Sequence, residues 1–288
     1  MAIRSLEALE KACENKNIYD VILEDDCMER GVTREESEKK MADLYAAIQH
    51  SAQNYTPTLR SASGMAGGDG AKMRSYVKAG KTICGEELGQ VIAQALEMGE
   101  NNACMKCIVA APTAGSCGVL PAVLLPYQQR EGLSDEAMVR AMYVAGAIGQ
   151  VVAAKASIAG AAGGCQAEIG TASAMGAAAL CYLGGGDAQA VCHAAAIAIK
   201  AMLGLVCDPI AGLVEVPCVK RNAAGAVIAM SSADMALAGI RSAVPPDEVI
   251  LAMREVGDKM DVSLKETGVG GVAGTPFGQK IAEKMGMA

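Results

Sequence analysis

Residues 158–186 read IAGAAGGCQAEIGTASAMGAAALCYLGGG, and this stretch decides the fold. It consists mostly of alanine and glycine, and such small side chains let the axes of packed helices approach closely. The period-two alternation that marks half-buried strands is almost absent from the chain. We therefore predict an all-α fold, a compact bundle of packed helices around a central Ala/Gly-rich helix.

Helix signals flank this stretch on both sides. Thr33 followed by Glu36 forms a capping-box pattern, and apolar residues then recur at helical spacing, which predicts a helix over 34–54. The glycine-rich run 61–73 is expected to be a loop or tight turn. One helical catalytic domain is predicted over 1–288, with peripheral N-terminal helices over 1–58. Further helices are expected over 86–100, from about 118, over 134–155, 187–204 and 220–239, and from 247 onward.

The composition limits the possible partners. The 288 residues are 52% hydrophobic and 20% charged, with a formal net charge of −7 and no long run of Lys or Arg, so the basic surface that nucleic acids require is missing. The N-terminus has no apolar signal region. The uncharged stretches 107–129 and 169–186 are interrupted by proline and glycine or are only weakly apolar. We expect a cytoplasmic protein that binds neither nucleic acid nor membrane.

Eleven cysteines are many for a reducing compartment, where disulfides are rare. They can be buried thiols, metal ligands or both. Cys165, Cys207 and Cys218 each lie at a predicted helix boundary beside glycine or proline, where free backbone N–H groups stabilise a thiolate. These residues alone support a metal site and three packed thiols about equally.

The other cysteines favour structural roles. Cys181 and Cys192 fall inside Ala-rich helices and are interpreted as core residues. Cys104 and Cys107 form a C-x-x-C pattern typical of zinc or redox sites, but no second such pair and no preceding strand support it. Glu168 stands out among the charged residues, because it follows Cys165 by three positions in apolar surroundings. The two histidines, His50 and His193, are interpreted as structural.

Four longer motifs point to a family. They are KCIVAAPTAGSCGVLPAVL (106–124), GGCQAEIGTASAMGAAAL (163–180), GLVCDPIAGLVEVPCVKRNA (204–223) and KETGVGGVAGTP (265–276). Together they resemble the catalytic alpha subunit of the two-chain bacterial iron-sulfur L-serine dehydratases. The resemblance runs from about Ser61 to Gly274.

The resemblance implies a cofactor and a reaction. Cys165, Cys207 and Cys218 would hold a [4Fe-4S] cluster by three thiolates, which leaves one iron open as a Lewis acid. That iron would take the hydroxyl of L-serine while a base removes the α-proton, and the products would be pyruvate and ammonia. No pyridoxal phosphate is expected.

The resemblance also implies site residues. The segment Ala111–Gly118 would bind the substrate carboxylate through backbone N–H groups and a hydroxyl. The loop 61–73 matches a second family motif near the site, and Arg221 is a candidate neighbour of the cluster ligands. The candidates for substrate binding are Ser63, Gly64, Thr113, Ala114, Gly115 and Ser116, and those for catalysis are Glu168, Asn222 and Lys265.

Two departures from the single-chain relatives imply a partner. Those relatives carry an additional half with a Ser-Ser-His-Thr motif, which is absent here, so a separate beta subunit is expected to supply it. They can also end in a cysteine that occupies the fourth iron, whereas no cysteine follows Cys218. The alternatives are a related cluster-dependent lyase acting on L-cysteine or L-threonine, and a non-catalytic thiol-rich binding subunit.

Overall fold

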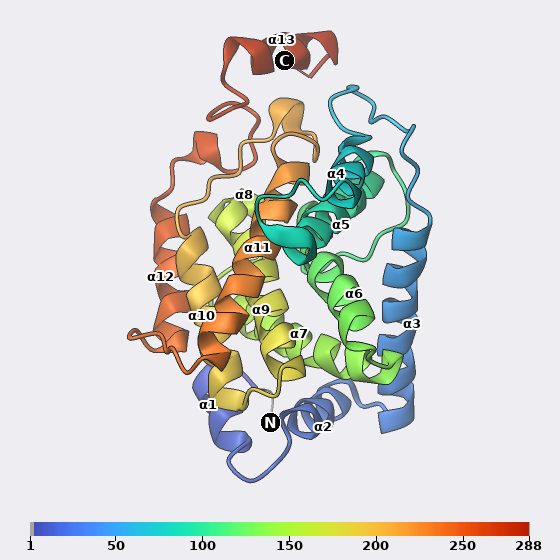
Figure 1. Ribbon diagram of the computed structural model, residues 1–288. Coiled ribbons are helices and arrows are strands. Elements are labelled where there is room, and N and C mark those ends of the chain that lie inside the picture. Colours follow the sequence, from blue (N-terminus) through green and yellow to red (C-terminus); the bar gives the residue numbers. More distant parts are fainter. Residues whose placement is uncertain (1–2, 288) are drawn as a thin grey trace.

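Helix α9 (Thr171–Leu183) lies at the centre of the computed structural model, which describes residues 3–287 (Figure 1). Nearly all its side chains are buried, and a Cβ at Gly176 would lie 3.2 Å from the Cβ of Ala229 on a neighbouring helix. The predicted central Ala/Gly-rich helix is therefore confirmed. The helices packed around it are α6 (Val119–Glu131), α7 (Asp135–Lys155), α10 (Ala188–Met202) and α11 (Cys218–Leu237).

The remaining helices complete an all-α fold, as predicted. No strand occurs among residues 3–287, where extended pairing is limited to an isolated parallel bridge between Cys207 and Lys265. The other α-helices are α1 (Leu6–Ala12), α2 (Ile18–Arg30), α3 (Arg34–Gln53), α4 (Asp69–Lys78), α5 (Gly85–Ala103), α8 (Gly160–Gly163), α12 (Pro246–Lys259) and α13 (Pro276–Lys284). Shorter turns are the 3₁₀-helices η1 (Ala114–Ser116), η3 (Ile210–Gly212) and η4 (Val262–Leu264), and the π-helix η2 (Gln166–Gly170).

Capping residues explain where several helices begin. Before α3, the Thr33 hydroxyl accepts a hydrogen bond from the Glu36 amide at 3.2 Å, and the Glu36 carboxylate accepts one from the Thr33 amide at 2.9 Å. This is the predicted capping box. Ser134 and Asp187 cap α7 and α10 through their side-chain oxygens. The observed bounds of α3, α5, α7, α10 and α11 lie within a few residues of the predicted ranges.

The glycine-rich run 61–73 differs from the prediction in its second half. It is a loop only as far as Gly68, because α4 begins at Asp69. The buried carboxylate of Glu100, at the end of α5, accepts the Asp69 amide at 2.6 Å and lies 3.4 Å from the Gly70 amide. A carboxylate at a helix N-terminus stabilises the helix, and this one comes from a distant segment that the local sequence does not reveal.

The decisive stretch 158–186 forms two helices and a π-turn. Gly164 adopts a φ of 78°, which ends α8 and redirects the chain into η2 and then α9. This interruption places Cys165 directly before the π-turn, where the backbone is not regular helix. Such π-turns occur often at functional sites.

Helices α1 and α2 cover one end of the bundle, and α3 runs along its side (Figure 1). Leu6 and Leu9 of α1 are fully buried, and they belong to one apolar core that extends along the chain to Met253. The domain predicted over 1–288 and its peripheral part over 1–58 stay predictions, and their outermost residues lie outside the described ones.

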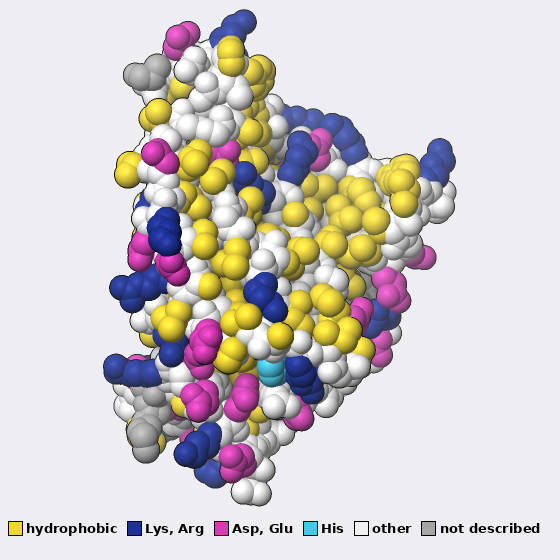
Figure 2. Space-filling model, turned by 90° about the vertical axis from the view of Figure 1, so that its left-hand side faces the viewer, with side chains coloured by type: hydrophobic (Ala, Val, Ile, Leu, Met, Phe, Trp, Pro, Cys, Tyr) yellow, Lys and Arg dark blue, Asp and Glu magenta, His cyan; other side chains and the backbone are white. Residues whose placement is uncertain are grey.

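Among residues 3–287, one helix, α7, is long and apolar enough to cross a membrane, but 67% of its apolar window is buried inside the molecule. Such burial is also typical of core helices. The apolar residues of α6 and α9, which carry most of the other uncharged stretches, are buried as well. On the face shown in Figure 2, basic and acidic side chains are interspersed around hydrophobic ones, so this face presents no broad basic surface.

Candidate functional site

The three predicted ligand cysteines come from three separate segments. Cys165 follows the break at Gly164, Cys207 lies in the loop between α10 and α11, and Cys218 is the first residue of α11. All three are buried, with 2%, 2% and 7% of their surfaces exposed. Each therefore lies at a helix boundary or in a connecting loop, as the sequence predicts.

The three thiols influence each other's ionisation. A hydrogen bond from Cys207 lowers the pKa of Cys165, and the nearby Arg221 guanidinium lowers it further. The same bond, together with burial, raises the pKa of Cys207. Burial and the negative charge of Cys165 raise the pKa of Cys218 to about 12. Of the three thiols, only Cys165 has its pKa lowered by its surroundings.

This donor set suits an iron-sulfur cluster. Thiolate sulfur is the ligand that such clusters prefer, and three cysteines from three segments leave one iron without a protein ligand. Among residues 3–287, no three His, Cys, Asp or Glu side chains meet closely enough for a single ion, but a cluster is larger than an ion and needs wider spacing. The Cys207 thiol packs directly on Gly160, because a Cβ there would lie 2.8 Å from the Cys207 Sγ.

Glu168 lies on the π-turn η2, beside the cysteines. Its Oε1 accepts a hydrogen bond from the Thr113 hydroxyl at 2.7 Å, and its Oε2 lies 3.8 Å from the Cys207 Sγ. Burial raises the pKa of the Glu168 carboxyl, and the negative charge of Glu266 raises it further. A carboxyl with a raised pKa that also contacts the thiol group is a candidate for proton transfer.

The turn Thr113–Ser116 faces Glu168. A Cβ on Gly115 would lie 3.3 Å from the Glu168 Oε1. Ser116 is fully buried, and its hydroxyl accepts the Thr113 amide at 3.3 Å, so it shapes the turn from inside. In the described part of the chain, the backbone N–H groups of Ala114 and Gly115 have no hydrogen-bond partner. Free N–H groups at such a turn can bind a carboxylate.

Asn222 holds this turn against the cysteine group. Its Oδ1 accepts the Gly118 amide at 2.8 Å, and its Nδ2 donates to the carbonyls of Gly115 at 2.8 Å and Cys218 at 2.9 Å. The amide of Asn222 thus joins the start of α6 to the start of α11. This arrangement gives Asn222 a positioning role, and direct contact with substrate stays a prediction.

Ser63 and Gly64 lie on a loop that is fastened to the segment before Cys218. The hydroxyls of Ser61, at 2.5 Å, and Ser63 both donate to the buried carboxylate of Glu215. The hydroxyl of Ser63 is therefore already bonded within the protein, and substrate binding by Ser63 and Gly64 stays a prediction. Gly64 is exposed and has a φ of 80°.

Lys265 approaches the site through its backbone. Residues 264 and 266 pair with Cys207, whose amide donates to Leu264 at 2.8 Å and whose carbonyl accepts from Glu266 at 2.7 Å. The Lys265 ammonium makes no hydrogen bond or ion pair with any residue that the structure describes. Its catalytic role stays a prediction.

Three residues that lie near the thiols were not predicted from the sequence as site residues. Gly160 and Glu266 approach Cys207 from two sides, and Asp208 pairs with Arg221 at 2.9 Å. Asp208 directly follows Cys207, which is the one local signal that could have singled it out. Gly160 lies in the stretch 158–186 and Glu266 in the motif 265–276, but both are far along the chain from Cys207 and no local pattern connects them with it.

Replacing Gly160 with alanine should destabilise the protein by about 1–3 kcal/mol, the usual cost of overpacking. The added Cβ would lie 2.8 Å from both the Cys207 Sγ and the Glu168 Oε2, so these groups would have to move. Gly146→Ala is the matched control, because a Cβ at Gly146 in α7 meets nothing within 4 Å and should stabilise the helix by up to about 1 kcal/mol. Chemical unfolding of both variants measures the difference, and equal stabilities would contradict the tight packing at Gly160.

The remaining thiols and imidazoles show structural surroundings. Cys181 and Cys192 are fully buried in the core, as predicted. The Nδ1 of His193 accepts the Ser242 amide at 3.1 Å, and burial lowers the pKa of His193, which favours the neutral ring. Cys107 is exposed and Cys104 only half-buried, and neither belongs to a metal-binding group among the described residues.

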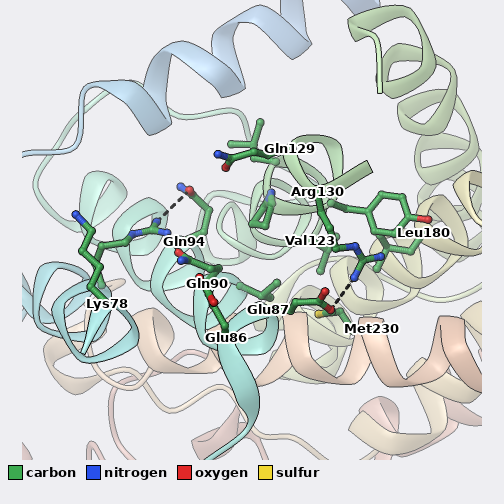
Figure 3. Close-up of a pocket in the computed structure, with 15 residues that line it drawn as sticks. Lys78, Glu86, Glu87, Gln90, Gln94, Val123, Gln129, Arg130, Leu180 and Met230 are labelled. Atoms are coloured by element: carbon green, nitrogen blue, oxygen red, sulfur yellow. Dashed lines mark hydrogen bonds and ion pairs between the residues drawn. The ribbon is translucent and has the colours of Figure 1, made fainter. Parts of the chain in front are cut away.

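A separate groove of about 560 Å³ lies between α4, α5 and α6, away from the cysteines (Figure 3). Its two arginines are already paired: Arg74 with Glu97 at 2.5 Å and Arg130 with Glu87 at 2.7 Å. None of the predicted site residues lines it. Despite its size, this groove is therefore not our candidate for the reactive site.

Comparisons with known proteins show the family of this chain. The family model described as serine dehydratase alpha chain matches residues 13–273. A probable L-serine dehydratase alpha chain of Bacillus subtilis is 44% identical over 98% of this chain and 95% of its own length. The L-serine dehydratase alpha chain of Peptoniphilus asaccharolyticus is 46% identical over 92% of this chain and 91% of its own length. L-serine dehydratase 1 of Escherichia coli is 45% identical over 62% of this chain but only 40% of its own length. The chain belongs to the serine dehydratase alpha chain family.

Proposed function

We propose that this protein is the catalytic alpha chain of an L-serine dehydratase, an ammonia-lyase that converts L-serine to pyruvate and ammonia. The observation that carries the proposal is the contact of the buried Cys207 thiol with the Glu168 carboxyl, which in turn bonds to the Thr113–Ser116 turn with its free N–H groups. Cys165, Cys207 and Cys218 would hold a [4Fe-4S] cluster, and no pyridoxal phosphate is required.

The cluster, when bound, supplies an iron that acts as a Lewis acid on the serine hydroxyl. The N–H groups of Ala114 and Gly115 would bind the substrate carboxylate and so orient the α-carbon toward Glu168. Glu168 would accept the α-proton, with the Thr113 hydroxyl holding its Oε1 in place. Loss of the hydroxyl and the α-proton leaves aminoacrylate, which tautomerises and hydrolyses to pyruvate and ammonia.

We further propose that a beta subunit completes the enzyme in the cytoplasm. Two close relatives are named alpha chains, and the chain matches only 40% of the longer Escherichia coli relative. The Ser-Ser-His-Thr motif is absent from this sequence and would come from that second chain. Eleven unpaired cysteines suit a reducing compartment.

The test is an anaerobic preparation of the alpha chain, assayed with its partner. We expect about four irons and four sulfides per chain, a broad visible absorption band and pyruvate formation from L-serine. A chelator that strips the iron should abolish the activity, and zinc should not restore it. A thiol-rich protein without iron or visible band would overturn the proposal in favour of a non-catalytic subunit. Faster turnover of L-cysteine or L-threonine than of L-serine would overturn the assigned substrate.

A further inference from the structure

Arg221 grips the loop that carries Cys207. It lies on α11, one turn after Cys218, and its Nη1 donates to the carbonyl of Val206 at 2.8 Å and pairs with the Asp208 carboxylate at 2.9 Å. Val206 and Asp208 are the two residues on either side of Cys207. One guanidinium on the helix of Cys218 therefore contacts the residues on both sides of Cys207.

The same guanidinium reaches the third cysteine. The positive charge of Arg221 lowers the pKa of Cys165. Only 17% of the Arg221 side chain and 4% of the Asp208 side chain are exposed, so this pair is shielded from water. Arg221 thus joins the helix of Cys218 to the loop of Cys207 by a hydrogen bond and an ion pair, and its charge acts on Cys165.

Asp208 extends this contact to the C-terminal glycine-rich loop. Its Oδ2 accepts the Val272 amide at 2.8 Å. Gly271 packs directly on the carboxylate: a Cβ there would lie 2.2 Å from the Oδ2, and the φ of 59° also favours glycine. The motif 265–276 is therefore fastened beside the cysteines through Asp208.

We propose that Arg221 is a positioning residue that keeps the loop of Cys207 in place against the helix of Cys218 around a bound cluster and, through Asp208, fastens the C-terminal glycine-rich loop beside them. The inference rests on the proposed function, since it assumes that the thiols hold a cluster. Arginine suits this role because its planar guanidinium offers several donors in a fixed arrangement, which lysine does not. Residues that orient metal ligands in this way typically contribute about 10–100-fold to metal affinity.

The experiment compares Arg221→Gln with Arg254→Gln in the anaerobically loaded full chain. Arg254 lies on α12 in an exposed ion pair with Asp258 at 3.8 Å, so its replacement removes the same charge away from the thiols. The measurements are the rate of iron transfer to a ferrous chelator and the reduction potential of the cluster. We expect Arg221→Gln to release iron about 10–100-fold faster than wild type. Its potential should become more negative, because a positive charge near the cluster is lost.

Two further variants separate positioning from folding. Arg221→Lys keeps the positive charge but loses the planar guanidinium with its several donors. It should release iron faster than wild type and more slowly than Arg221→Gln. The second is the double variant Asp208→Asn with Arg221→Gln. Asparagine at 208 can still accept the Val272 amide, so this protein lacks the Arg221–Asp208 pair but has no buried unpaired carboxylate. If Arg221→Gln does not fold, these two proteins decide the question.

Iron release and potential equal to those of wild type in the Arg221 variants would overturn the positioning role. An iron-free wild-type protein would instead overturn the proposed function, so the two failures are distinguishable. Circular dichroism identifies a folding defect, and a folded Arg221→Gln chain with fast iron release supports the proposal.

Discussion

Replacing Cys207 with serine should remove the cluster and reduce serine deamination to below about one-thousandth of the wild-type rate. Lewis-acid activation contributes several kcal/mol, and about 4 kcal/mol corresponds to about a thousandfold in rate. Cys207 lies centrally in the thiol group, since it contacts both Cys165 and Glu168 and is bracketed by the Arg221 pair. Iron content, the visible band and pyruvate formation are measured under anaerobic conditions.

The matched control is Cys84→Ser. Cys84 is exposed at the start of α5, where serine is a favourable capping residue, so this variant should keep full iron content and activity. Full iron retention in Cys207→Ser would contradict the assigned ligand set. Loss of iron in both variants would show that the preparation removes the iron and that the loss is not caused by the missing Cys207 thiolate.

The fold could be predicted because its signals are local. The capping box at Thr33, the caps at Ser134 and Asp187, and the small residues of α9 each act over a few positions, and the structure confirms them. The start of α4 was missed for the opposite reason. It depends on Glu100, a buried carboxylate that is distant along the chain and that only the tertiary structure brings to the Asp69 amide.

The same distinction between local and long-range signals applies to the candidate site. The three cysteines and Glu168 could be singled out from the sequence, because cysteine at helix boundaries and an acid in apolar surroundings are unusual. These residues alone support a metal site and packed thiols about equally, and only the family resemblance implies a cluster. What the sequence does not reveal is how these groups contact each other. The bond from Thr113 to Glu168, the amide of Asn222 between two helix starts and the close packing of Cys207 on Gly160 all join segments far apart in the chain.

These contacts also distinguish the carboxyls near the thiols. Glu168 is largely buried and bonded to Thr113, whereas Glu266 is exposed at the edge of the site with a φ of 61°. A proton acceptor next to bound substrate needs a fixed position and a pKa closer to neutrality than that of a free carboxyl. Glu168 meets both conditions, and this difference leads to the second large prediction.

Replacing Glu168 with glutamine should lower the turnover of L-serine by about 10²–10⁴-fold while the iron content stays unchanged. Glutamine has nearly the same shape and its carbonyl can still accept the Thr113 hydroxyl, but it cannot take up the α-proton. Anaerobic turnover and exchange of the α-deuterium of labelled L-serine measure the loss.

Two matched variants show whether the loss is specific to Glu168. Glu255→Gln on the exposed side of α12 should behave as wild type, and Glu266→Gln should lose less activity than Glu168→Gln. A Glu168→Gln enzyme that retains turnover while Glu266→Gln loses it would reassign the proton acceptor to Glu266, and loss of iron in Glu168→Gln would show that this side chain supports the ligands and not the proton transfer.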